Sequence, residues 1–172
     1  ILKPLHADNW PGESVHFAVP IQLSDPESEQ FHAAVLYRFQ GQLWIGDVQW
    51  HLVSRRAPAR PSKSVRWIQA DIGVEDQQIL AATVDAWLDK NAGKIPYSVA
   101  HPGGVVFKNG VWVGSEPGQG LTCATFVVAL FNELGIPFID TLTWDIRDGD
   151  VEWADMVLAQ LKTNPLVTPE HA

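Results

Sequence analysis

The sequence predicts an α+β fold in which a small antiparallel β-sheet packs against helices. Two observations lead to this prediction. Between residues 31 and 69, runs rich in β-branched and aromatic residues follow one another with no helix-length segment between them, which favours antiparallel pairing. Segments with apolar residues at helical spacing come only later in the chain.

The strands are expected in the first part of the chain. The segment FHAAVLYRFQGQLWIGDVQWHLVSRR, which starts at Phe31, predicts two strands joined by a turn at Gln40-Gly41. A Pro-broken loop, APARPS, follows, and KSVRWIQADI is typical of a third strand. We expect residues 1–29 to form an irregular N-terminal arm with one strand at 15–23, because they are rich in Pro, Asp, Ser and Glu. Residues 30–172 are then expected to form a single domain.

Three helices are predicted in the second part of the chain. Apolar residues recur at helical spacing in residues 74–93 and again in about 151–162. Between them, GLTCATFVVALFNELG (120–135) has an apolar face, with Thr122 as the N-cap. The segment before the cysteine helix is rich in loops, with two short strand-like runs, at 105–107 and 111–113, around Lys-Asn-Gly.

Composition narrows the classes of partner and cofactor. The net charge of −8 argues against nucleic acid and anionic membranes as general partners, and no apolar run is long enough for an integral membrane segment. A single cysteine excludes an intramolecular disulfide. No Cys/His cluster has zinc spacing, so we expect neither a metal nor an organic cofactor. The chain begins at Ile1 rather than Met, which is compatible with a cytoplasmic protein or with an exported one whose N-terminus has been removed.

The single cysteine, Cys123, lies in the first predicted turn of the helix that follows Thr122. A helix N-terminus carries about half a positive charge, which favours the thiolate. The backbone N–H groups there are also free to bind an oxyanion. This placement therefore suits a nucleophile. The alternative is a buried cysteine that serves as a small hydrophobic residue, the commonest role of a free cysteine.

The segment around Cys123 resembles the nucleophile helix of papain-like proteins, although only His171 follows the cysteine here. This order resembles the circularly permuted branch of the superfamily, which includes permuted NlpC-type hydrolases of the YiiX kind and the lecithin:retinol acyltransferase group. FHAAVLYRFQGQLWIGDV resembles the family's His-bearing strand pair. AGKIPYS resembles its Gly-x-x-Tyr-Asp segment, with Ser98 in place of Asp, and LTCATFVVALFNELGIP resembles its cysteine helix. The resemblance covers about residues 31–137.

The resemblance implies a permuted papain-like fold. It also implies a cysteine-dependent hydrolase (an amidase or peptidase) or an acyltransferase, acting through a thioester intermediate. It makes Cys123 the nucleophile and His32 the general base. Asp47 is the choice for the group that orients the imidazole, and Tyr97 is expected to line the oxyanion site. Gln119, four residues before the cysteine, is a further candidate donor to the oxyanion.

Two choices remain open at this stage. His51, at the end of the second strand, is an alternative base. With a two-residue turn at Gln40-Gly41, Asp47 lies diagonally opposite His32 on one face, whereas a three-residue turn would remove it from the site. The substitutes for the orienting group are two glutamines on the second and third strands, Gln49 and Gln69.

The implied substrate is an amide, such as a cell-wall peptide, a glycopeptide or an isopeptide, or else a lipid acyl ester. Five basic residues are expected around one hairpin tip, either as a solvated loop or as a docking site for an anionic substrate or lipid headgroup: Arg55, Arg56, Arg60, Lys63 and Arg66. The rival interpretation is a catalytically inactive papain-like fold that serves as a protein- or ligand-binding module. Cys123 would then be buried and unreactive.

Overall fold

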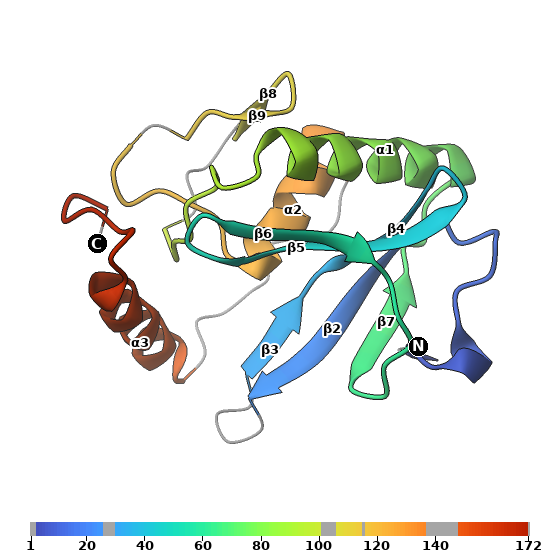
Figure 1. Cartoon of the computed structure of the whole chain (residues 1–172), viewed down its shortest axis with the longest axis horizontal. Coiled ribbons are helices and arrows are strands. Elements are labelled where there is room, and N and C mark those ends of the chain that lie inside the picture. Colours follow the sequence, from blue (N-terminus) through green and yellow to red (C-terminus); the bar gives the residue numbers. More distant parts are fainter. Residues whose placement is uncertain (1–2, 26–29, 101–105, 115, 137–147, 172) are drawn as a thin grey trace.

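The computed structural model describes residues 3–25, 30–100, 106–114, 116–136 and 148–171. Within them, a seven-stranded antiparallel sheet has the order β1-β7-β2-β4-β5-β6, with β3 paired to β2, and helices pack against it (Figure 1). The predicted α+β class is therefore confirmed. The sheet consists of β1 (Lys3–Pro4), β2 (Phe17–Asp25), β3 (Gln30–Ala33), β4 (Val35–Phe39), β5 (Gln42–Trp50), β6 (Val53–Pro58) and β7 (Val65–Gln69).

The segment before residue 30 is not a separate arm. The strand expected at 15–23 is β2, and it pairs with β3, β4 and β7 in the middle of the sheet. Phe17 packs in the core beneath the helices, whereas Ala18 packs in a second apolar cluster on the opposite face. Because the apolar run FAVPI is buried on both faces, this strand belongs to the domain, although the residues around it are polar.

The first predicted turn is confirmed in position and length. Phe39 pairs with Gln42, so Gln40 and Gly41 form a two-residue turn between β4 and β5. Both turn residues have positive φ, 50° and 77°, as the tightest hairpin turns require.

The predicted first strand is, however, divided at Ala34 into β3 and β4. β3 pairs with β2, so His32 lies opposite Gln22 and not opposite Gln49, and its meeting with Asp47 does not follow from the register of this hairpin.

The long second strand of the prediction is wrong, because the chain turns again at His51 and Leu52. Trp50 pairs with Val53, and β6 returns antiparallel to β5. Leu52 takes a left-handed conformation, with φ of 59°, at a position where Gly or Asn would have indicated the turn. As a result, the five basic residues do not gather at one hairpin tip, since Arg55 and Arg56 lie along β6.

The predicted helices are confirmed as α1 (Val74–Lys90), α2 (Cys123–Glu133) and α3 (Asp150–Thr163). Helices α1 and α2 pack together against the sheet. The approach of α1 is close at Gly46 on β5, where an added Cβ would lie 2.2 Å from Cδ1 of Leu88. The two strand-like runs around Lys-Asn-Gly form a small antiparallel hairpin of β8 (Phe107–Lys108) and β9 (Val111–Trp112).

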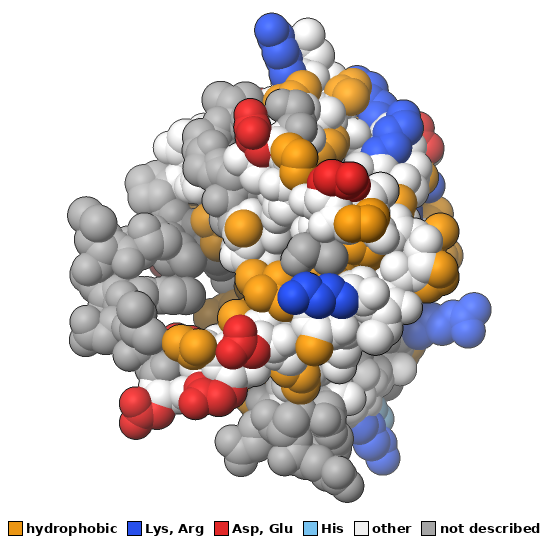
Figure 2. Space-filling model, turned by 90° about the vertical axis from the view of Figure 1, so that its left-hand side faces the viewer, with side chains coloured by type: hydrophobic (Ala, Val, Ile, Leu, Met, Phe, Trp, Pro, Cys, Tyr) orange, Lys and Arg blue, Asp and Glu red, His pale blue; other side chains and the backbone are white. Residues whose placement is uncertain are grey.

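Helix α3 buries Val157 and Leu161 and exposes acidic residues such as Glu152 and Asp155. Figure 2 looks onto this side of the molecule and shows acidic side chains at its surface. None of the helices in the described residues is long and apolar enough to cross a membrane.

Candidate active site

Helix α2 begins at Cys123 because Thr122 caps it as predicted. The Thr122 hydroxyl accepts a hydrogen bond from the Thr125 N–H (3.1 Å), and the Thr125 hydroxyl accepts one from the Thr122 N–H (2.7 Å). This reciprocal pair fixes where the first turn starts. The N–H groups of Cys123 and Ala124 have no acceptor in the backbone of the helix, and they lie at its positive end.

The start of α2 is held by the neighbouring segment around residues 96–100. The Leu121 N–H donates to the Pro96 carbonyl (2.9 Å), and the Gly120 N–H donates to the Ala100 carbonyl (3.3 Å). An added Cβ at Gly120 would lie only 2.4 Å from the Pro96 oxygen, so this contact requires glycine. Ser98 is buried and accepts a hydrogen bond from the Ala100 N–H (2.9 Å). Its role in the structure is to hold this segment.

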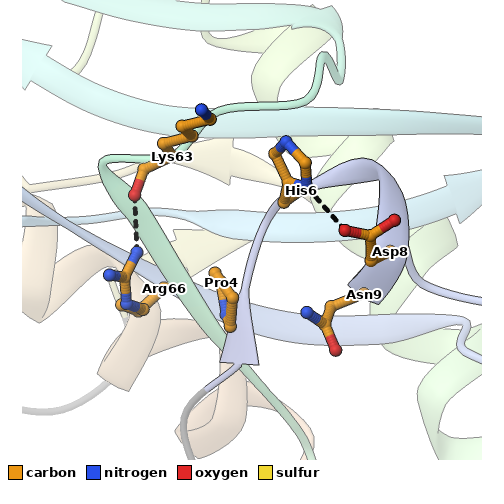
Figure 3. Close-up of a pocket in the computed structure, with 6 residues that line it drawn as sticks. All are labelled: Pro4, His6, Asp8, Asn9, Lys63 and Arg66. Atoms are coloured by element: carbon orange, nitrogen blue, oxygen red, sulfur yellow. Dashed lines mark hydrogen bonds and ion pairs between the residues drawn. The ribbon is translucent and has the colours of Figure 1, made fainter.

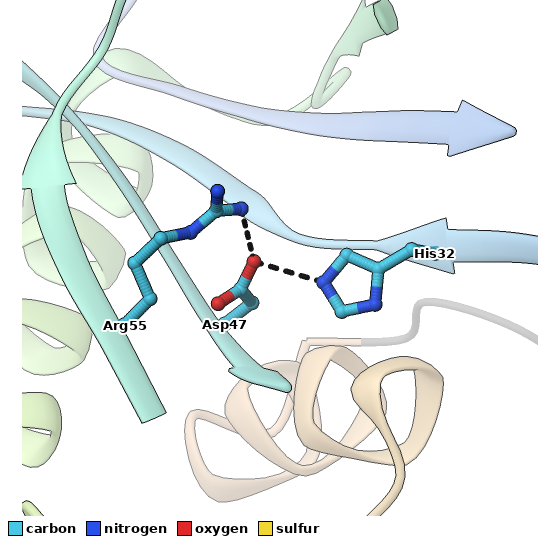
Figure 4. Close-up of polar contacts among 3 residues, drawn as sticks. All are labelled: His32, Asp47 and Arg55. Carbon is cyan, nitrogen blue, oxygen red and sulfur yellow. Dashed lines mark hydrogen bonds and ion pairs between the residues drawn. The ribbon is translucent and has the colours of Figure 1, made fainter. Parts of the chain in front are cut away.

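His32 and Asp47 meet beside the start of α2. His32 lies on β3 and Asp47 on β5, and Nε2 of the imidazole donates to Oδ2 of the carboxylate at 2.8 Å (Figure 4). Asp47 is fully buried, whereas the imidazole is partly exposed. Because Nε2 is bonded to the carboxylate, Nδ1 is the ring nitrogen left for a second partner.

Cys123 lies close enough to the imidazole to be this second partner, and the two side chains interact electrostatically. Burial lowers the pKa of His32, but the hydrogen bonds and charges of Asp47 and Cys123 outweigh it and raise this pKa to about 9. Burial raises the pKa of Cys123, but His32 and the N–H groups of Ala33 and Ala124 outweigh it, so this pKa falls below its ordinary value. The arrangement therefore favours a thiolate–imidazolium pair.

Tyr97 also lies near the sulfur. Its ring packs against Trp50, with centroids 4.8 Å apart, and the side chain is buried. Burial and the charge of Cys123 raise the pKa of Tyr97, so its hydroxyl keeps its proton. Among the described residues, the backbone N–H of Gln119 donates to the Glu116 carbonyl, and its side chain makes no hydrogen bond. No contact therefore brings Gln119 to the sulfur.

The alternative base, His51, lies elsewhere. It sits in the β5–β6 turn, and its ring packs against His171 at 4.7 Å between centroids. Burial and the charge of His171 lower its pKa. It is His171, not His51, whose Nε2 hydrogen-bonds the Tyr97 carbonyl, at 3.1 Å, and Nδ1 of His51 is buried without a hydrogen-bond partner among the described residues. The structure thus brings His32, not His51, to Cys123. The substitutes for Asp47 remain exposed on the surface, namely Gln49 and Gln69.

One residue of the site was missed in the sequence. The guanidinium of Arg55 bonds to Oδ2 of Asp47, the same oxygen that accepts from His32 (Figure 4). Arg55 on β6 is the direct register partner of Asp47. Opposite charges often face each other on paired strands, and this tendency predicts the Arg55–Asp47 pair once the turn at His51 and Leu52 is known. In the sequence, Arg55 stands out only as one of five neighbouring basic residues.

The rest of that basic cluster is dispersed. Arg56 donates to Asp85 at 2.8 Å. Lys63 and Arg66 line a shallow, open depression at the β1–β7 end of the sheet, whose walls are completed by Pro4, His6, Asp8 and Asn9 (Figure 3). The structure therefore does not gather a basic docking site beside Cys123. In the described part of the chain, no group of three or more Cys, His, Asp and Glu side chains could hold a metal ion.

Comparison of the chain with protein-family models, curated proteins and solved structures found no match. The function of the site is therefore argued from its own geometry.

Proposed function

We propose that the protein is a cysteine-dependent hydrolase or acyltransferase of the permuted papain-like type. The single observation that supports this proposal is the position of His32, which joins Cys123 at the start of α2 to the fully buried Asp47. A buried structural cysteine needs neither a charged imidazole partner nor an orienting carboxylate. Both are what a thiol nucleophile requires.

In the proposed reaction, the Cys123 thiolate attacks a carbonyl carbon and forms a tetrahedral oxyanion. The N–H groups at the start of α2 and the Tyr97 hydroxyl are the donors available to this oxyanion. As the intermediate collapses, the bond to the leaving nitrogen or oxygen breaks, and the His32 imidazolium gives that atom its proton. A thioester on Cys123 and a neutral imidazole remain.

Neutral His32 then accepts a proton from the second substrate, which attacks the thioester. With water as the acceptor, the products are a carboxylic acid and the regenerated thiolate–imidazolium pair. An amine or alcohol acceptor gives acyl transfer. Amides, such as cell-wall peptides, glycopeptides or isopeptides, and lipid acyl esters all fit this chemistry.

The test is covalent trapping of the acyl-enzyme. The protein is mixed with a p-nitrophenyl acyl ester, and intact mass and peptide mapping locate the acyl group. We expect rapid release of nitrophenolate with acylation at Cys123, which is lost in Cys123→Ser and strongly slowed in His32→Gln. His51→Gln is the matched control and should behave as the parent. A parent protein whose Cys123 is never acylated would contradict the proposal and favour the binding-module interpretation.

A further inference from the structure

Asp47 is an unusual carboxylate because a single oxygen serves two cationic partners. Oδ2 accepts from both His32 and Arg55, while Oδ1 is buried and has no hydrogen-bond partner among the described residues. A fully buried carboxylate is costly unless it is paired. With Oδ1 unpartnered, the charge of Asp47 is held by the two contacts at Oδ2.

Arg55 reaches Asp47 from the edge of the sheet. β6 is the last strand in the sheet order, and about a third of the Arg55 side chain is exposed. The guanidinium therefore covers the carboxylate from the solvent side, while the imidazole approaches it from β3. The next residue, Arg56, is paired to Asp85 instead, so its charge is already balanced.

The charges around the candidate site balance only if Arg55 is counted. A Cys123 thiolate and a His32 imidazolium cancel, and the Asp47 carboxylate then needs one further cation. Tyr97, the remaining titratable side chain in electrostatic contact with Cys123, stays neutral. Without Arg55, the cluster would carry a net negative charge in a buried setting, which opposes formation of the thiolate.

We propose that Arg55 is a positioning residue of the proposed catalytic site, which holds the Asp47 carboxylate against His32 and supplies the charge that balances this carboxylate. This inference rests on the proposed function. Arg55 does not touch the reacting atoms; it acts through Asp47.

The test is the rate of Cys123 alkylation by iodoacetamide as a function of pH. It compares the parent with Arg55→Gln, Arg55→Lys and the neighbouring control Arg56→Gln. Removing a cation raises the pKa of both Cys123 and His32. In Arg55→Gln, both inflections of the profile should therefore move to higher pH, by about 0.5 to 1 unit at the effective dielectric of a partly exposed site. Arg55→Lys keeps the charge and should keep both inflections, as should Arg56→Gln.

The outcomes separate this inference from the proposed function. A parent thiol that ionises at an ordinary pH, unaffected by His32→Gln, overturns both. If the alkylation profile of the parent has a low inflection and Arg55→Gln has the same inflection, the inference alone is overturned. A lower alkylation rate in Arg55→Gln without a shift of the inflections also overturns it, because a merely structural role of Arg55 would give that result. Should Arg55→Gln not fold, Arg55→Lys decides. Inflections like those of the parent support the inference, and displaced inflections contradict it.

Discussion

Gly120 is the position where one methyl group should disturb the candidate site most. In Gly120→Ala, the new Cβ would meet the Pro96 carbonyl oxygen at 2.4 Å and its carbon at 2.9 Å. Both are backbone atoms, so the two segments must separate. That movement weakens the hydrogen bonds from Leu121 to Pro96 and from Gly120 to Ala100. Each is worth about 1 kcal/mol, and overpacking costs about 1–3 kcal/mol. Alanine also lowers the conformational entropy of the unfolded chain, which stabilises the folded protein by about 0.4–1 kcal/mol.

The net loss expected in the free energy of unfolding is therefore about 2–4.5 kcal/mol, or roughly 4–18 °C in Tm for a chain of this size. Chemical or thermal unfolding followed by circular dichroism measures it. Gly12→Ala is the matched control, because nothing lies within 4 Å of an added Cβ there and its φ is not in the left-handed region. It should be neutral or slightly stabilising. A Gly120→Ala protein as stable as Gly12→Ala would refute the close contact that places α2.

Two further substitutions test the surroundings of Cys123. Thr122→Ala removes the cap of α2 and should lower the free energy of unfolding by about 1 kcal/mol, measured by urea denaturation, whereas no loss would contradict the capping geometry. Asp47→Asn removes the partner that raises the pKa of His32, so the alkaline inflection of Cys123 alkylation should fall below pH 9. Because the pKa of His32 is raised in the folded protein, the stability that its imidazolium contributes is present below pH 6.5 and is lost as the pH rises through about 9. Asp47→Asn should therefore lower the free energy of unfolding more at pH 6 than at pH 10.

Local sequence signals predicted most of the elements because each signal acts within a few residues. The apolar face behind Thr122 and the Gln40-Gly41 turn both appear where the sequence places them. The turn at Leu52 was missed because a leucine with positive φ carries no turn signature. The central place of β2 was missed for a different reason. Pairing with β3, β4 and β7 is a long-range property that composition does not reveal.

The candidate site shows the same division. The choice of Cys123, His32 and Asp47 followed from the helix start and the motif order. The expected hairpin register did not contribute, because His32 lies on β3, which pairs with β2. Arg55 did not follow from these signals, because its pairing with Asp47 depends on the unrecognised turn. Gln119 was expected on the basis of its spacing from the cysteine, but spacing alone does not orient a side chain in a loop.

The measurement that tests the central claim most directly is the pH dependence of Cys123 alkylation in the parent, His32→Gln and His51→Gln. Without the imidazole, burial raises the pKa of the Cys123 thiol and only the N–H groups of Ala33 and Ala124 oppose it, so a smaller fraction of the thiol is ionised at pH 7. We expect the rate at pH 7 to fall by about 10- to 100-fold in His32→Gln and to be unchanged in His51→Gln. A thiol equally slow in all three proteins would contradict the Cys123–His32 pair and, with it, the proposed enzyme.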